Sequence, residues 1–424
     1  MKNKRFSFST LITLVILAVA LAISVTMMIA MRHFNSQVNA VTQRQALYNH
    51  INDIDTKVRQ QYPSIDEEAL RSALAAGYVN ALSDPYAQYL DSTAYKRATS
   101  VRQGQVTDLG ITLKAETSGL VVSKVASGSA AQQAGVLVGD LLVSVDGVPV
   151  FAPDRATLQR KLDTTEERVL LSVKRGDKTM AFDLTAYSYQ IQTVTERMLS
   201  DSVGYIRIST FLDNTVSQFR AAFSSLENQG AVNFVFDLRG CTSGGSRESL
   251  EGILSYLMPH GAYAIWSGNT GESYNLVADT AHTLSGSSVT LVNKDTRGEA
   301  ELFAGILQEF SMTTVIGEKT AGKGKFQDFV TLQADNSALS LTVGEITLMR
   351  GGSIEGVGIT PNKEVLMLAE KTAMIGSMAD ADDDQLQAAL SVFSANLPVG
   401  NAATTAPTVS ATPSTGTTET TAAQ

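Results

Sequence analysis

Residues 290–327, TLVNKDTRGEAELFAGILQEFSMTTVIGEKTAGKGKFQ, decide the fold of this chain. They read as an apolar strand (Thr290–Asn293), a polar turn, an amphipathic helix, a second strand (Thr313–Gly317) and a loop in which glycines flank Lys323. Such a strand–helix–strand unit is typical of an α/β core and aims the helix N-terminus into a cleft beyond the strand ends. The residue at that N-terminus is Gly298.

Composition sets the broad class of the protein. The chain has 424 residues, 44% of them hydrophobic, so it has room for several domains with real cores. A formal net charge of −9 argues against a nucleic-acid partner, which calls for basic faces. Four histidines and one cysteine provide neither metal-ligand spacing nor a disulfide framework, and no cofactor is indicated. Cys241 is expected to be a half-buried structural residue, because no histidine lies near it in sequence.

The N-terminus carries a membrane-anchor pattern. Lys2, Lys4 and Arg5 precede an apolar run from Leu11 to Met31. At about 1.5 Å per residue this run makes roughly 30 Å of helix, enough to cross a bilayer. The basic flank favours a cytoplasmic N-terminus with the bulk of the chain outside, in the cell membrane as a single-pass protein. A cleavable signal peptide is the alternative, with Ala18–Ala20 as the small-residue site, although the apolar run continues past it.

Residues 101–185 change to short alternating strands with glycine turns. The order of strands and helices, and SGSAAQQAGVLVGDLLVSVDGVPV (127–150) in particular, resembles a PDZ domain. The resemblance implies binding of a peptide C-terminus as an added strand, with backbone N–H groups holding the carboxylate. The implied groove residues are Leu109, Gly110, Ile111, Leu113, Leu158 and Leu162. For each of these apolar side chains, a plain core role is the competing interpretation.

The rest of the chain alternates strands and helices from Tyr187 to Leu368, which predicts an α/β core. The most specific stretches are MLSDSVGYIRISTF, VFDLRGCTSGG, VIGEKTAGKGKFQ and GGSIEGVGITPNKEV. Together with the PDZ pattern and the preceding SDPYAQYLD, they resemble the carboxyl-terminal-processing peptidases, or tail-specific serine proteases. The resemblance covers residues 44–368.

Members of that family resemble one another in their catalytic residues. They use a serine as nucleophile, a lysine as general base and a glutamine that orients the lysine. By resemblance Lys323 is the base and Gln327 the orienting residue of a Ser–Lys dyad. The resemblance also implies oxyanion donors on Gly244 and Gly245 and on the N–H of Glu299. A base of this kind needs burial that lowers the lysine pKa.

The nucleophile position departs from the family. Where the family has a sequence like Ser-Ala-Ser-Ala-Ser-Glu, this chain has residues 296–301, Thr-Arg-Gly-Glu-Ala-Glu, so the serine is replaced by Gly298. Thr296 carries a hydroxyl nearby, but a role in capping or holding the turn is favoured for it. Arg297 and Glu299 are expected to crowd or pair across the mouth of the site.

Two functional hypotheses result. The first is a pseudoprotease that binds unfolded or C-terminal peptide segments of extracytoplasmic proteins without cutting them. The second is an active endopeptidase that uses Thr296, or water activated by Lys323, in place of serine. Homo-oligomerisation is left open.

The predicted fold class is multidomain, mixed α+β and α/β. Its expected parts are a cytoplasmic stub and transmembrane anchor (1–33), a helical cap and linker (34–96), the PDZ domain (97–186), the protease core (187–368), a C-terminal helix (369–397) and a disordered Thr/Ala/Pro/Ser tail (398–424).

Overall fold

A computed structural model describes residues 8–165, 167–242, 244–278, 284 and 286–395. The chain divides into two compact units, Met1–Tyr78 and Val79–Gln424, which are described separately. The predicted tail lies outside the described residues.

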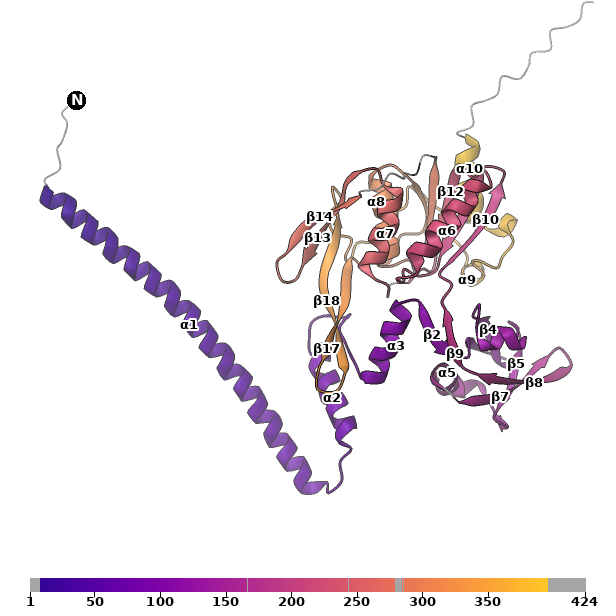
Figure 1. The fold of residues 1–424 in the computed structure, drawn as a ribbon, viewed down its shortest axis with the longest axis horizontal. Helices are drawn as coiled ribbons and strands as arrows, with labels where there is room; N and C mark the ends of the chain where they lie inside the picture. Colours follow the sequence, from indigo (N-terminus) through magenta and orange to yellow (C-terminus); the bar gives the residue numbers. More distant parts are fainter. Residues whose placement is uncertain (1–7, 166, 243, 279–283, 285, 396–424) are drawn as a thin grey trace, which may run out of the picture. The chain divides into compact units, whose positions relative to one another are not determined.

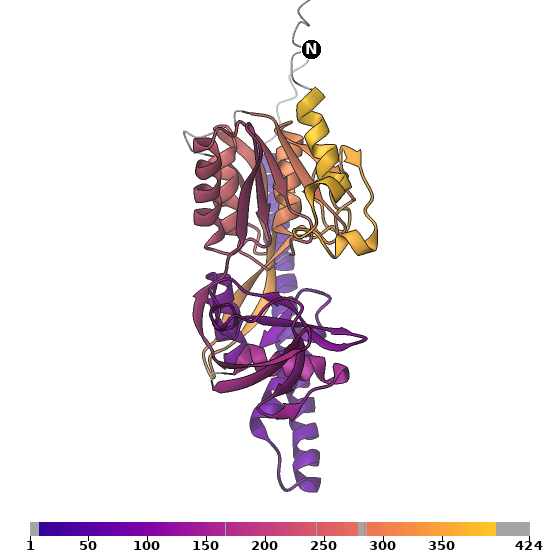
Figure 2. The same cartoon turned by 90° about the vertical axis from the view of Figure 1, so that its right-hand side faces the viewer.

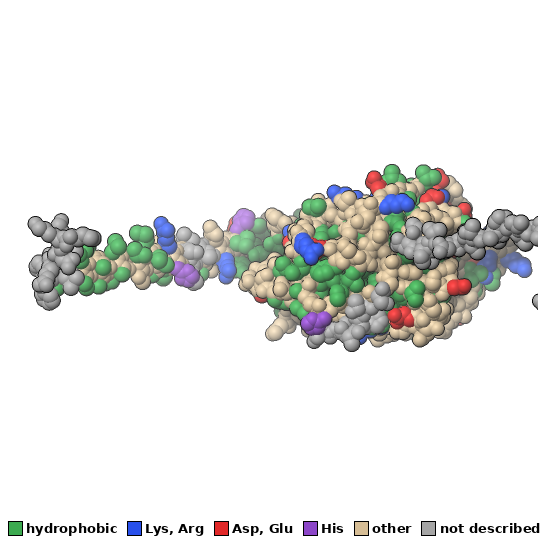
Figure 3. All heavy atoms as spheres, turned by 90° about the horizontal axis from the view of Figure 1, so that it is seen from above, with side chains coloured by type: hydrophobic (Ala, Val, Ile, Leu, Met, Phe, Trp, Pro, Cys, Tyr) green, Lys and Arg blue, Asp and Glu red, His purple; other side chains and the backbone are tan. Residues whose placement is uncertain are grey.

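The first unit is helical. α1 (Phe8–Gln61) is one continuous helix, and α2 (Glu67–Asn80) follows and runs just past the boundary of the unit. Within α1, Leu14–Asn35 is long and apolar enough to cross a membrane, and hydrophobic side chains cover this part of the helix (Figure 3). α2 begins at Glu67, and the Asp66 carboxylate before it accepts the Ala69 N–H at 3.0 Å, as the side chain of an N-cap residue does.

The predicted PDZ domain has the expected elements (Figure 1). Its sheet has the order β3–β4–β5–β7–β8, so β3 is an open edge, and β6 pairs with β5. The bounds are β3 (Ile111–Glu116), β4 (Gly119–Val125), α4 (Ala130–Ala134), β5 (Leu141–Val145), β6 (Val148–Pro149), α5 (Arg155–Thr164), β7 (Arg168–Arg175) and β8 (Lys178–Thr185). The Ser129 cap and the left-handed Gly135 delimit α4, as the sequence indicates.

The PDZ domain is an insertion in the core. The chain enters along β2 (Gln105–Asp108) and leaves along β9 (Tyr187–Gln190), and these strands pair antiparallel with each other. The predicted boundary at residue 97 falls inside α3 (Ser92–Arg102), and β2 begins at Gln105. That helix packs on β17, where the Arg102 guanidinium lies 4.1 Å from the Phe329 ring centroid.

The protease core is built on a six-stranded sheet with the order β10–β11–β12–β15–β16–β19, parallel except for β10. Helices α6, α7 and α8 cover one face and α10 the other (Figure 2). The bounds are β10 (Val194–Ser200), β11 (Val203–Ile208), α6 (Thr215–Asn228), β12 (Asn233–Asp237), α7 (Arg247–Leu257), β15 (Ser288–Val292), α8 (Glu299–Glu309), β16 (Thr314–Gly317) and β19 (Lys363–Glu364). The predicted unit at 290–317 is therefore confirmed.

A second sheet, which the sequence interpretation did not anticipate as a unit, lies beside the first. Its strands are β1 (Gln88–Leu90), β13 (Gly261–Gly268), β14 (Ser273–Ala278), β17 (Lys325–Leu332) and β18 (Ser337–Leu348). β18 is its centre, since it pairs with β1, β13 and β17. β17 begins at Lys325, two residues after Lys323, so the sheet holds one end of the lysine loop.

The C-terminal helix belongs to the core and is not a separate part. α9 (Ala369–Thr372) leads to α10 (Asp384–Ala395), whose Leu386 and Phe393 are buried against the sheet. Arg239 is fully buried and joins β12 to the start of α10. It donates to Asp237 at the end of β12 and to Asp383, the residue before α10. The predicted division at residue 368 is therefore corrected.

Candidate active site

The turn between β15 and α8 is held by buried hydrogen bonds. The Thr296 hydroxyl donates to the Leu238 carbonyl at 2.9 Å and accepts the Asn293 N–H at 3.0 Å. Its side chain is wholly buried. The structure thus supports the turn-holding role for Thr296, since its hydroxyl proton is already committed inside the turn.

Gly298 is the N-cap of α8, with φ 68° and ψ −124°. This backbone conformation is open to glycine and strained for any other residue. The family resemblance assigns the nucleophile to the N-terminus of α8. The residue at that position therefore has no side chain. No atom of residue 298 itself can attack a peptide carbonyl.

Glu301, which the sequence interpretation passed over, ties this turn to the lysine loop. Its carboxylate accepts the N–H of Gly298 at 3.0 Å, of Lys323 at 2.7 Å and of Gly322 at 2.6 Å, and also the Thr320 hydroxyl. The side chain is fully buried. A Glu at the third helical position is the usual signal of a capping box, so the residue was detectable as a cap. The hydrogen bonds of Glu301 to the lysine loop could not be predicted from this signal.

Lys323, the predicted base, lies half buried on the loop before β17. Burial lowers the pKa of its amine, the nearby Arg297 lowers it further, and the carboxylates of Glu299 and Glu355 oppose the shift. The amine nitrogen lies 4.9 Å from the centroid of the Tyr86 ring. A lysine that loses its proton readily in this setting can act as a general base.

Tyr86 and Glu355 are further residues of the site that the sequence interpretation did not assign. The Tyr86 hydroxyl donates to Glu355 at 2.9 Å, and Glu355 also accepts the Gly324 N–H at 2.8 Å. Burial and the Glu355 carboxylate raise the pKa of Tyr86 to about 12. Both residues lie in stretches that carry the family resemblance, SDPYAQYLD and GGSIEGVGITPNKEV, and that was the available signal.

Gln327 lies on β17, half buried, beside the lysine loop. Its amide nitrogen donates to the Lys325 carbonyl at 3.2 Å and to the Thr342 hydroxyl at 3.3 Å. These contacts fix the amide to its own sheet. Orientation of Lys323 by Gln327 stays a prediction.

The two glycines predicted as oxyanion donors precede α7, and the third predicted donor, Glu299, begins α8. Gly244 and Gly245 lead into α7, and a Cβ on Gly245 would lie 1.6 Å from the Phe211 carbonyl oxygen, so a glycine is required there. Burial raises the pKa of the Glu299 carboxyl, and the backbone N–H groups of Glu299 itself and of Gly244 oppose that shift with a smaller effect.

Glu299 therefore differs from its expected position at the mouth. Its side chain is only 4% exposed, and its Oε2 has no hydrogen-bond partner in the part of the chain that the structure describes. Arg297, by contrast, is exposed. A helix N-terminus attracts a carboxylate, which explains why the acid folds inward. The position of Ser243 lies outside the described residues.

Cys241 is fully buried, more so than the sequence suggested. Burial raises the pKa of its thiol well above the ordinary value. Since the thiolate is the nucleophilic form, Cys241 is inert and does not substitute for the serine.

The predicted groove residues fall into two groups. The side chains of Leu109, Ile111, Leu113 and Leu162 are buried in the PDZ core, and Leu158 packs against it. Gly110 has φ 76°, and a Cβ there would lie 2.1 Å from Ser129, so only glycine fits. What β3 offers a ligand is therefore its backbone edge rather than these side chains.

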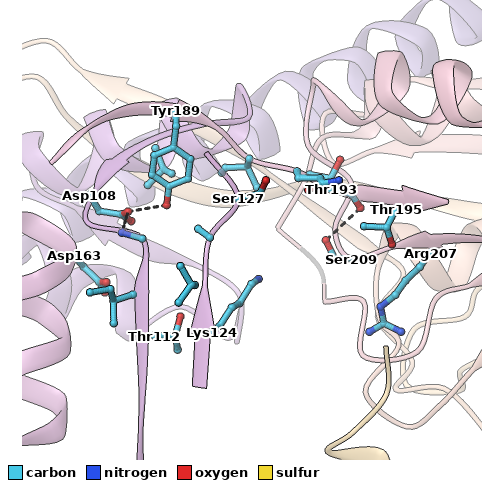
Figure 4. Close-up of a pocket in the computed structure, with 17 residues that line it drawn as sticks. Asp108, Thr112, Lys124, Ser127, Asp163, Tyr189, Thr193, Thr195, Arg207 and Ser209 are labelled. Carbon is cyan, nitrogen blue, oxygen red and sulfur yellow. Dashed lines mark hydrogen bonds between the residues drawn. The ribbon is translucent and has the colours of Figure 1, made fainter. Parts of the chain in front are cut away.

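A pocket of about 460 Å³ adjoins the start of β3 (Figure 4). Gly110, Ile111 and Thr112 line it on the PDZ side, and Thr195 and Arg207 on the core side. At its PDZ end the Asp108 carboxylate accepts the Gly110 N–H and the Tyr189 hydroxyl, both at 2.7 Å. The pocket thus reaches the backbone N–H expected to hold a peptide carboxylate.

Comparisons with known proteins agree with this geometry. Residues 202–365 match the model of peptidase family S41, and residues 107–185 match a PDZ domain. The chain is 30% identical to carboxyl-terminal-processing peptidase 2, chloroplastic, of Arabidopsis thaliana over 67% of this chain and 58% of that protein. It is 27% identical to the carboxyl-terminal-processing protease of Synechocystis over 77% of each chain.

Among solved structures, a Bacteroides fragilis protein assigned to the S41 proteases superposes with a TM-score of 0.56 at 18% identity. The match covers 74% of this chain and 87% of that one and bears on the fold alone. With the S41 and PDZ matches in the order that the structure shows, the chain belongs to the PDZ-containing carboxyl-terminal-processing peptidases of family S41.

Proposed function

We propose that this protein is a membrane-anchored, extracytoplasmic pseudoprotease that binds peptide segments, C-terminal ones in particular, without cutting them. The observation that carries the proposal is at the start of α8. Residue 298 is a glycine, and the side chain of Glu299, the first residue of the helix, is buried.

The second half of that observation adds to the first. A tetrahedral intermediate needs its oxyanion to sit on the predicted donors, the N–H groups of Gly244, Gly245 and Glu299. A carboxyl that is buried at the same helix N-terminus competes with the substrate carbonyl for these donors. Loss of the nucleophile and obstruction of the donors both oppose the reaction.

Peptide binding is supported by the PDZ match and by the open edge of β3. An exposed strand edge offers backbone hydrogen bonds to an added strand. Anchoring is supported by Leu14–Asn35, and the basic residues before it favour an extracytoplasmic location for the remainder.

An active endopeptidase is the second candidate, and one observation favours it: Lys323 keeps a lowered pKa. Water activated by this lysine is the form of the reaction that the geometry leaves open, because the Thr296 hydroxyl is committed to its turn. Enzymes without their nucleophile retain only about 10³–10⁴-fold acceleration over water.

The test uses the full chain in lipid nanodiscs with unfolded casein. We expect no cleavage by the native protein, and cleavage by Gly298→Ser combined with Glu299→Ala, which restores the hydroxyl and clears the donors. Adding Lys323→Ala to that pair should abolish cleavage. Casein cleavage by the native protein that Lys323→Ala removes would overturn the proposal. Membrane anchoring is tested separately, since a chain beginning after Asn35 should leave the membrane fraction.

A further inference from the structure

The open edge of the PDZ sheet is already hydrogen-bonded to a side chain of the same domain. Gln159, on α5, accepts the Leu113 N–H through Oε1 at 2.7 Å. It donates through Nε2 to the Ile111 carbonyl at 2.8 Å. Both backbone groups lie on β3, on the side away from β4.

These two groups are the ones that an added peptide strand would use. Residues 111 and 113 are alternate positions of an edge strand, and alternate residues of a strand present their N–H and C=O groups to the same neighbour. The side-chain amide of Gln159 has one carbonyl and one N–H group facing β3, so it substitutes for one peptide unit of a ligand.

The amide is held in this position by a third contact. Its Nε2 also donates to Asp163 Oδ1 at 2.7 Å, one helical turn further along α5. Burial raises the pKa of Asp163, and Arg97 lies 3.8 Å from its other oxygen. Gln159 is half buried. The glutamine is therefore oriented by its own helix toward the strand edge.

The end of the groove that is expected to hold a peptide carboxylate is also occupied by a group of the chain itself. The Gly110 N–H donates to Asp108, whose carboxylate is buried and also accepts the Tyr189 hydroxyl (Figure 4). An acid of the chain thus takes the place expected for the terminal carboxylate of a peptide. Both kinds of ligand contact, backbone and carboxylate, are made internally.

We propose that Gln159 is an internal latch of the PDZ groove, which a peptide must displace in order to pair with β3. This inference rests on the proposed peptide-binding function and adds a regulation to it. The ligand is an extended peptide backbone, and its affinity is lowered by the two hydrogen bonds that the latch gives up. A structural glutamine that merely fixes α5 to β3 would have the opposite effect, since its loss would loosen the groove.

The test measures binding of a fluorescent decapeptide with an apolar last residue and a free carboxylate to the full chain in nanodiscs. Because each of the two net hydrogen bonds contributes about 1 kcal/mol and 1.4 kcal/mol is a factor of ten, Gln159→Ala should tighten binding roughly 30-fold. Gln159→Met, which keeps the volume, should do the same if alanine perturbs folding. Arg160→Ala, an exposed neighbour on the same helix, is the matched control and should change nothing.

Hydrogen exchange of the peptide-free protein provides an independent measurement. The Leu113 amide should exchange faster in Gln159→Met than in the native chain and become protected again when the peptide binds. Equal or weaker binding by both variants would overturn the latch while leaving the proposed function intact. Absence of binding by the native chain and by both variants would overturn peptide binding and the latch together.

Discussion

The main-chain N–H groups of Gly298 and Lys323 donate to one and the same oxygen, Glu301 Oε2, at 3.0 and 2.7 Å. The N-cap of α8 and the lysine loop are thus fixed relative to each other by a third residue. This link uses only backbone groups of residues 298 and 323, so it does not depend on the side chain at position 298.

Replacement of Glu301 should show how much this link contributes. Glu301→Ala leaves the buried N–H groups of Gly298, Gly322 and Lys323 without their acceptor, and each such group costs about 1–3 kcal/mol. We expect a loss of at least about 3 kcal/mol in the free energy of unfolding of the core, measured by urea denaturation. Glu248→Ala, at an exposed position in the first turn of α7, is the control and should stay within about 0.5 kcal/mol.

Restoring the serine alone should destabilise the protein. At φ 68° and ψ −124° a serine is strained, so Gly298→Ser should lower stability by about 1–3 kcal/mol. It should also cleave casein more slowly than the same change combined with Glu299→Ala. Equal rates for the single and the double variant would show that Glu299 does not obstruct the oxyanion donors.

Glu299 should make stability depend on pH. Its folded pKa is raised above the ordinary 4.5 because burial disfavours the charged form. The stability that it contributes is therefore full below pH 4.5 and is lost as the pH rises through the folded pKa. Glu299→Gln stays neutral, so it should be more stable than the native chain at pH 7.5 and equal to it below pH 4.5. A difference in melting temperature that is constant from pH 4 to 8 would contradict this sign.

Asp108 should set how strongly the groove prefers a free C-terminus. Its carboxylate sits on the Gly110 N–H and repels a second carboxylate there. Asp108→Asn removes about 1 kcal/mol of repulsion, so the ratio of affinities for a free-acid peptide and its amide should rise roughly five-fold. Fluorescence titration with the two peptides measures it, and an unchanged ratio would place the ligand carboxylate elsewhere.

The C-terminal helix should be essential to the core. Leu386 is 1% exposed in the cluster between α10 and the sheet, so Leu386→Ala should cost about 2–5 kcal/mol. Leu366→Ala, at a residue 72% exposed, is the matched control and should be nearly neutral. Thermal unfolding monitored by circular dichroism would separate the two, and equal melting temperatures would show that α10 is dispensable.

Most elements of the fold could be predicted from local sequence patterns. The Ser129 cap, the Gly135 stop and the strand–helix–strand unit at 290–317 each rest on neighbouring residues and were predictable. The second sheet was not predicted, because the pairing of β1 with β18 joins residues far apart in the chain. Periodicity along one segment contains no information about such a partner.

The candidate site likewise has features that local motifs predicted and features that they did not. The motifs placed Lys323 and Gly298 correctly at the loop and the helix N-terminus. They could not give the direction of a side chain, so Glu299 was expected at the mouth and Gln159 was not considered. The contacts of Gln159 depend on backbone groups of β3, a segment distant in sequence.

The pairing of Gln88–Leu90 with Ala338–Ser340 also sets an order of events during synthesis. The strand partners of the PDZ domain all emerge from the ribosome between residues 105 and 190, so that domain can fold early. The second sheet must wait for β18, and the six-stranded sheet must wait for α10, at the end of the described chain, to cover its second face. A finished peptide-binding module is therefore expected to be tethered to an unfinished core while translation continues.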